Sequence, residues 1–145
     1  MVRTVLAVAV LALGVTALVA QTDPIKERQA LMKENGKQSK LGNDMVQAKR
    51  PFNLDEAKKV LATFQEAGEK APALFPDTSR TGGDTAALPA IWENKADFDA
   101  RFAKLASDSK AAIDATKDPD TFKAQFTAVT KNCGGCHQNY RKKET

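Results

Sequence analysis

The spacing of apolar residues restricts this chain to a helical fold. Beyond residue 20 no segment shows the sustained alternation of a β-strand, whereas apolar residues recur three and four positions apart in several segments. Four residues of the types that cap helices precede the predicted helical segments: Asp23, Asn53, Asn94 and Asp118. Proline follows the first and the last of them, at the first helical position, where it is well tolerated. The sequence therefore predicts an all-α domain of four helices.

The first predicted helix runs from Pro24 to about Gln47 and stops before Pro51. Gly36 and Gly42 lie inside it, and each costs about 1 kcal/mol of helix stability relative to alanine, so both need a packing reason. The other three helices carry apolar stripes that should face a common core. The stripes contain Ala57, Val60, Leu61 and Phe64; Phe98, Phe102, Leu105 and Ile113; and Phe122, Phe126, Val129, Cys133, Cys136, His137 and Tyr140.

A long connection, residues 71–93, separates the second and third predicted helices and exceeds the usual length of a loop in a compact domain. It contains Leu74, Phe75 and Trp92, which indicate that it packs against the domain. Four amphipathic helices with one long crossover predict an antiparallel four-helix bundle with a long loop between helices two and three.

The first 20 residues resemble a secretory signal peptide. Arg3 precedes an apolar run over residues 5–20, which is short for a membrane-spanning helix and ends in a small residue. We expect cleavage after Ala20, with an uncleaved membrane anchor as the alternative, and a single functional domain at 21–145 outside the cytoplasm. Apart from Arg3, 21 basic residues stand against 18 acidic ones without a dense basic stripe, so nucleic-acid binding is not expected.

The motif Cys-Gly-Gly-Cys-His at residues 133–137 contains every cysteine and histidine of the chain. On a helix, Cys133, Cys136 and His137 share one face, and the stripe they continue faces the core. A structural zinc site would need a fourth ligand. A thioredoxin-like dithiol belongs near a βαβ pattern and a helix N-terminus, neither of which is found here. The third possible use of two cysteines with this spacing is covalent haem attachment, which the motif C-x-x-C-H favours.

In such an attachment the two thiols form thioether bonds with the porphyrin, and the adjacent histidine binds the iron. Gly134 and Gly135 lack a Cβ and allow the backbone to approach the macrocycle closely. This motif contains every cysteine and histidine of a chain that is expected to be helical and exported. That combination favours one haem c over a haem-free dithiol protein.

The placement of the motif on the last helix of a bundle resembles the cytochrome c′ family, the class II c-type cytochromes. The resemblance extends from "KERQALMK" through "LFPDTSRTGGDTAALPAIWENKADFDARF" to "CGGCHQNYRKK". It implies that Cys133 and Cys136 hold the haem, that His137 is the proximal ligand and that Arg28 reaches a haem propionate. It also implies a periplasmic protein, either monomeric or homodimeric.

The sixth iron ligand decides the function. In high-spin members of the family the residue four positions after that arginine is apolar and often leucine, which leaves the iron open to NO or CO. Here that residue is Met32, which resembles the low-spin branch, and Gly36 one turn later leaves room for a flat ring. The bare sequence also allows Met32 simply to fill the core.

A Met/His pair leaves no open position on the iron and suits one-electron transfer. The sequence therefore predicts an electron carrier with protein redox partners and no enzymatic activity. The alternative is a gas-binding haem protein. Arg141, one turn beyond His137, lies either near the proximal side of the haem or at the helix C-terminus with Lys142 and Lys143, where positive charge is favourable and could help an acidic partner dock.

Overall fold

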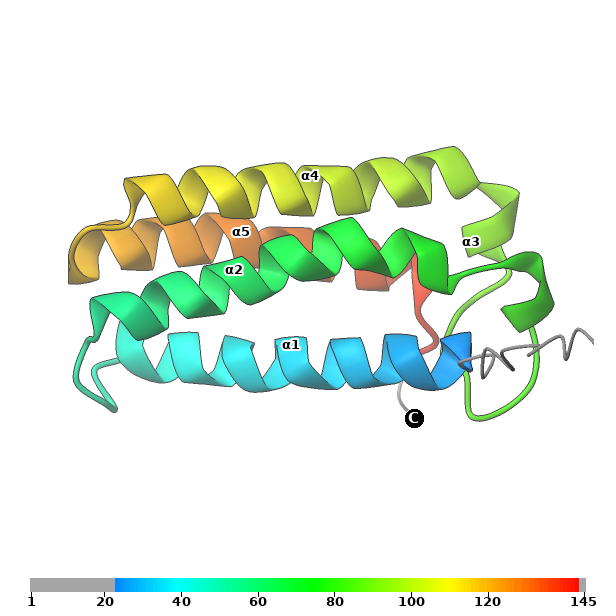
Figure 1. Cartoon of the computed structure of the whole chain (residues 1–145), viewed down its shortest axis with the longest axis horizontal. Helices are drawn as coiled ribbons and strands as arrows, with labels where there is room; N and C mark the ends of the chain where they lie inside the picture. Colours follow the sequence, from blue (N-terminus) through cyan, green and yellow to red (C-terminus); the bar gives the residue numbers. More distant parts are fainter. Residues whose placement is uncertain (1–22, 144–145) are drawn as a thin grey trace, which may run out of the picture.

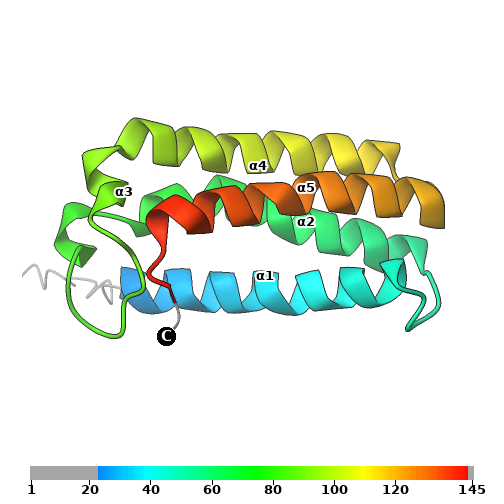
Figure 2. The same cartoon turned by 180° about the vertical axis from the view of Figure 1, so that it is seen from behind.

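Four long helices follow one another in an antiparallel bundle, each running opposite to the next along the chain (Figures 1 and 2). The computed structural model describes residues 23–143, so the predicted signal peptide lies outside the described residues. The long helices are α1 (Pro24–Val46), α2 (Leu54–Lys70), α4 (Lys95–Ala115) and α5 (Pro119–Tyr140). A short helix, α3 (Ala90–Glu93), and two 3-10 turns, η1 (Ala71–Leu74) and η2 (Asp77–Ser79), lie in the predicted long loop. The predicted fold class and bundle are confirmed.

The helix starts follow the predicted caps at three of four places. Asp23 Oδ1 accepts hydrogen bonds from the backbone N–H of Ile25, at 3.0 Å, and of Lys26. Asn53 Oδ1 accepts from the Glu56 N–H at 2.9 Å. At α5, the Asp118 carboxylate accepts from the Thr121 N–H, and the Thr121 hydroxyl oxygen accepts from the Asp118 N–H, which completes a capping box.

The start of α4 at Asn94 is also in the predicted place, but it is built differently. Asn94 caps no backbone N–H with its side chain; its own N–H donates to the Ala90 carbonyl because the short helix α3 directly precedes α4. The sequence analysis did not predict α3.

Close packing explains one of the two glycines inside α1. A Cβ at Gly42 would lie 2.3 Å from Cε2 of Phe126 on α5, so only glycine permits this approach. At Gly36, by contrast, no heavy atom lies within 4 Å of an added Cβ. Helix packing therefore does not require glycine at position 36, and what this glycine provides is open space beside α1.

The predicted loop packs against the domain, as expected. The Trp92 indole N–H donates to the Phe75 carbonyl at 3.1 Å, and the Phe75 ring lies edge-on to Phe98 with centroids 4.7 Å apart. Farther along, the loop pairs with the end of the chain, where the Leu88 N–H donates to the Tyr140 carbonyl and the Lys142 N–H to the Ala86 carbonyl, at 3.0 and 2.8 Å. The loop therefore covers one end of the bundle.

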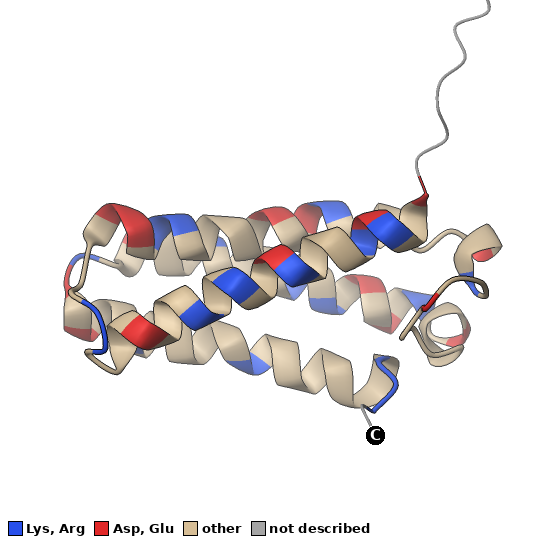
Figure 3. Cartoon of the chain, turned by 90° about the horizontal axis from the view of Figure 1, so that it is seen from below, with Lys and Arg blue, Asp and Glu red and all other residues tan. Residues whose placement is uncertain are grey.

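Charges of both signs are dispersed along the helices, as Figure 3 shows for the face that carries α1. Among residues 23–143, no helix is long and apolar enough to cross a bilayer.

Candidate functional site

A cavity of about 430 Å³ lies at the end of the bundle that the loop covers. Its walls come from the first half of α1, the first half of α4, the last turns of α5 and the loop. The volume is within the range of about 300–1,000 Å³ typical of ligand pockets. All five predicted site residues line it: Arg28, Met32, Cys133, Cys136 and His137.

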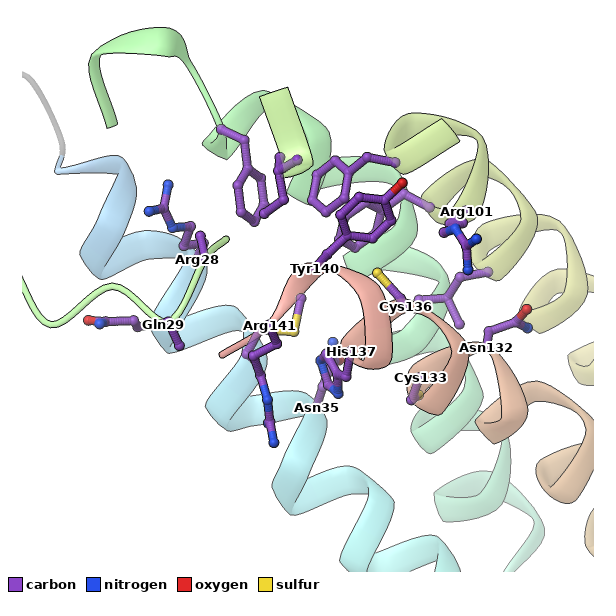
Figure 4. A pocket seen from close by; sticks show the side chains of 18 of the residues that line it. Arg28, Gln29, Asn35, Arg101, Asn132, Cys133, Cys136, His137, Tyr140 and Arg141 are labelled. Carbon is purple, nitrogen blue, oxygen red and sulfur yellow. The ribbon is translucent and has the colours of Figure 1, made fainter. Parts of the chain in front are cut away.

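The last turns of α5 bring the motif residues to the cavity (Figure 4). Cys133, Cys136 and His137 are half-buried, and the two cysteines are not joined by a disulfide. Burial raises the pKa of both thiols. A reactive dithiol needs the opposite shift, so the geometry argues against thioredoxin-like chemistry. Within residues 23–143 no group of three His, Cys, Asp or Glu side chains is placed to hold a metal ion.

The His137 imidazole lines the cavity. Burial, and secondarily the charge of Arg141, lowers its pKa below the ordinary histidine value. A neutral ring presents a nitrogen lone pair, which a protonated ring lacks.

The α1 wall contributes Met32 and, one turn later, Gly36. Met32 is partly buried and packs against the hydrophobic core. Asn35 also lines the cavity, and its Oδ1 is buried without a hydrogen-bond partner. Because buried polar atoms are normally hydrogen-bonded, this oxygen indicates a missing polar partner. The sequence analysis did not single out Asn35, since an asparagine on a helix gives no signal of its own.

Arg28 is buried, with 4% of its surface exposed. Its Nη1 donates to the Leu74 carbonyl and the Ser79 hydroxyl, at 3.1 and 2.8 Å. Its Nη2 donates to the Ser79 carbonyl and the Thr85 hydroxyl, at 3.0 and 2.7 Å. Arg28 thus clamps the loop onto α1, and an ordinary surface ion pair is excluded.

Among residues 23–143, no carboxylate forms an ion pair with Arg28. Burial lowers its pKa, and none of its hydrogen bonds goes to a carboxylate, although the more distant Asp23 favours the charge. The guanidinium also lies 4.7 Å from the centroid of the Phe75 ring. A buried cation beside a cavity indicates a site that can accept negative charge.

On the opposite side, α4 contacts α5 through a polar group that the sequence analysis missed. Arg101 Nε donates to Asp97 Oδ2 at 2.7 Å, and its Nη1 donates to the Gly135 carbonyl at 3.0 Å. The Tyr140 hydroxyl donates to the same Asp97 oxygen. Tyr140 also lines the cavity. An Asp–Arg pair four residues apart on a helix is typical of an ordinary surface pair, so the sequence gives no signal for this group.

These observations test whether the residues fit a haem. The cavity offers two thiols and a neutral imidazole on one wall, and a methionine with open space at Gly36 on another. The buried Arg28 cation adds a polar contact for a group that is mostly apolar and carries carboxylates. The donor set fits.

Comparisons with known proteins point the same way. The family model described as cytochrome c′ matches residues 23–141. The chain is 44% identical to cytochrome c′ of Rhodopseudomonas palustris over 133 residues. The aligned residues cover 92% of this chain and 91% of that protein. It is 33% identical over 148 residues to cytochrome c-556 of the same organism, over 99% of each chain. The solved structure of the R. palustris cytochrome c′ superimposes with a TM-score of 0.83, over 86% of this chain and 100% of that one.

Proposed function

Because the chain belongs to the cytochrome c′ family and so carries one covalent haem c, we propose that it is a low-spin electron carrier with His137 and Met32 as axial ligands. Haem iron, when bound, supplies a centre that gains and loses one electron. Relatives named cytochrome c-556 support the coarser statement that the protein is a haem electron carrier. The finer proposal is carried by one observation: Met32 of α1 and His137 of α5 line the same cavity.

The chain's own residues divide the work. Cys133 and Cys136 would hold the ring through thioether bonds, since both side chains lie on the wall of the cavity and form no disulfide. His137 offers a neutral nitrogen from the same helix face. We propose that Arg28 lies next to the haem propionates. Their negative charge would balance the positive charge of this buried side chain.

A methionine and a histidine that both stay bound leave no vacant position for a small-molecule substrate, so we infer no enzymatic activity. The same ligands serve both oxidation states, and little structure then has to move with each electron. The partners are proposed to be redox proteins, met in the periplasm after export by the N-terminal signal.

The test is the optical spectrum of the holoprotein with one methionine changed at a time. Met32→Leu should turn a low-spin spectrum high-spin and make the reduced protein bind CO. Met45→Leu is the matched control, because Met45 lies on the same helix, 6% exposed in the core, and does not line the cavity. Both changes nearly conserve volume and should cost less than about 1.5 kcal/mol.

A wild-type protein that is already high-spin and binds CO without delay would refute Met32 ligation. The gas-binding alternative would then replace the proposal. Retention of haem by the denatured chain tests the covalent attachment separately, and cell fractionation tests export.

A further inference from the structure

The contact between α4 and α5 holds the chain on both sides of Cys136 and His137. Arg101 holds the Gly135 carbonyl, one residue before Cys136, and Asp97 holds the Tyr140 hydroxyl, three residues after His137. The two side chains of α4 are themselves joined by the Arg101–Asp97 ion pair. The segment between these two points therefore has little freedom to move relative to α4.

Packing reinforces the two hydrogen bonds. Tyr140 is 6% exposed, and its ring lies edge-on to Phe98 of α4 with centroids 5.2 Å apart. The Arg101 guanidinium lies 5.5 Å from the centroid of the Tyr140 ring, so it contacts α5 at both Gly135 and Tyr140. A rigid supporting shell of this kind fixes how a metal ligand is oriented.

The group also places charge beside the attachment site. Figure 4 shows Arg101 next to Cys136 at the α4 side of the cavity. Arg101 Nη1 lies 3.0 Å from the carbonyl oxygen of Gly135, the residue before Cys136. Asp97 carries the opposite charge next to it, 2.7 Å from Arg101 Nε.

We propose that Arg101 and Asp97 are positioning residues of the haem centre, which fix the proximal turns of α5 and set the reduction potential through opposed charges. The inference rests on the proposed function, because it presumes a haem on Cys136 and His137. Neither residue touches the proposed iron ligands; each acts through α5.

The sign of each effect follows from electrostatics. Reduction adds one negative charge to the centre, so a nearby cation favours the reduced state and a nearby anion opposes it. Arg101→Gln should lower the reduction potential, and Asp97→Asn should raise it. A purely structural role for the pair would instead move both variants in the same direction, since each substitution breaks the same ion pair.

The experiment is a spectroelectrochemical titration of the holoprotein for wild type, Arg101→Gln, Asp97→Asn and the control Lys104→Gln. Lys104 also lies on α4 and pairs with an acid on its own helix, Asp108; this acid, and not Lys104 itself, accepts a hydrogen bond from Asn132 of α5. We expect the Arg101 and Asp97 variants to change the reduction equilibrium constant roughly three- to tenfold, about 28–59 mV for one electron. Lys104→Gln should shift it by a clearly smaller factor.

A second reading separates positioning from charge. Arg101→Lys keeps the charge but has no fork to hold Asp97 and Gly135 together. The reduction potential of Arg101→Lys should differ from that of the wild type by no more than that of Lys104→Gln does. The electron paramagnetic resonance g values, which report the orientation of the iron ligands, should change.

Shifts of the same sign for Arg101→Gln and Asp97→Asn, or an Arg101→Gln shift no larger than that of Lys104→Gln, would overturn the proposal. If Arg101→Gln yields no holoprotein, Asp97→Asn still decides, because only the charge argument requires its potential to rise. A wild type without covalent haem would refute the proposed function instead, and the two failures are thus distinguishable.

Discussion

Replacing Gly42 with alanine should destabilise the bundle, whereas the same replacement at Gly36, on the same helix, should not disturb helix packing. A Cβ at Gly42 would lie 2.3, 2.8 and 2.9 Å from three atoms of the Phe126 ring. That ring cannot easily turn away, because Phe126 is 6% exposed and lies against Phe64 and Phe122, with centroids 6.2 and 5.3 Å away.

The magnitude follows from two opposing terms. Overpacking a confined site costs about 1–3 kcal/mol, and the confined ring places Gly42 in the upper half of that range. Alanine returns about 1 kcal/mol of helix propensity. The net loss of unfolding free energy is therefore about 1–2 kcal/mol, which lowers the unfolding midpoint by roughly 4–10 °C in a domain of this size.

At Gly36 no protein atom opposes the new methyl group, so the protein itself would gain the helix propensity. Gly36 lines the cavity, however, and in the holoprotein a methyl there should meet the haem and shift its absorption spectrum. Circular dichroism at 222 nm during heating measures stability, and the visible spectrum measures the haem. If Gly42→Ala melted at or above the wild-type temperature, the packing argument would be wrong.

Two further predictions concern the loop and pH. Arg28→Met should lower the free energy of unfolding by about 2–4 kcal/mol, because it breaks four hydrogen bonds to a charged group and leaves the buried Ser79 oxygens without the Arg28 donors. Urea denaturation measures this loss, and an unchanged midpoint would contradict the role of Arg28 in holding the loop. The pH prediction concerns Asp97, whose pKa in the folded state is lowered by hydrogen bonds, first from Tyr140 and then from Arg101. The stability that these hydrogen bonds add is fully present above the pKa of the unfolded state, about 3.9. It is lost as the pH falls through the lower pKa of the folded state. Asp97→Asn should therefore reduce the loss of melting temperature below pH about 4, and an identical acid dependence in both proteins would exclude the contribution of this carboxylate.

The parts of the fold that the sequence predicted are those decided by neighbours along the chain. The caps at Asp23, Asn53 and Asp118 act within three residues, and the motif residues share a face because of helical spacing alone. Met32 was singled out through the family resemblance, and the structure brings it to the same cavity as His137.

What sequence reasoning missed depends on partners far along the chain. Arg101 forms an unremarkable pair with Asp97, and its contact with Gly135 joins residues 34 positions apart. The loop partners of Arg28 lie 46 to 57 positions away, so nothing local reveals that it is buried. The short helix α3 escaped prediction because its cap residue, Pro89, makes no side-chain hydrogen bond and the helix has only four residues.

The pairing of the loop with the chain beyond α5 has a consequence for the order in which the molecule folds. The bundle forms largely from hairpins of neighbouring helices, but the end that holds the cavity closes only when residues near 28, 79–88 and 140–142 meet. Such distant contacts bear the largest loop-closure entropy and form late. The same contacts should open first under native conditions, with amide hydrogens of Leu88 and Lys142 exchanging before those of the α2–α4 core. We therefore expect the contacts between the loop and residues 140–142 to form last when this protein folds and to open first.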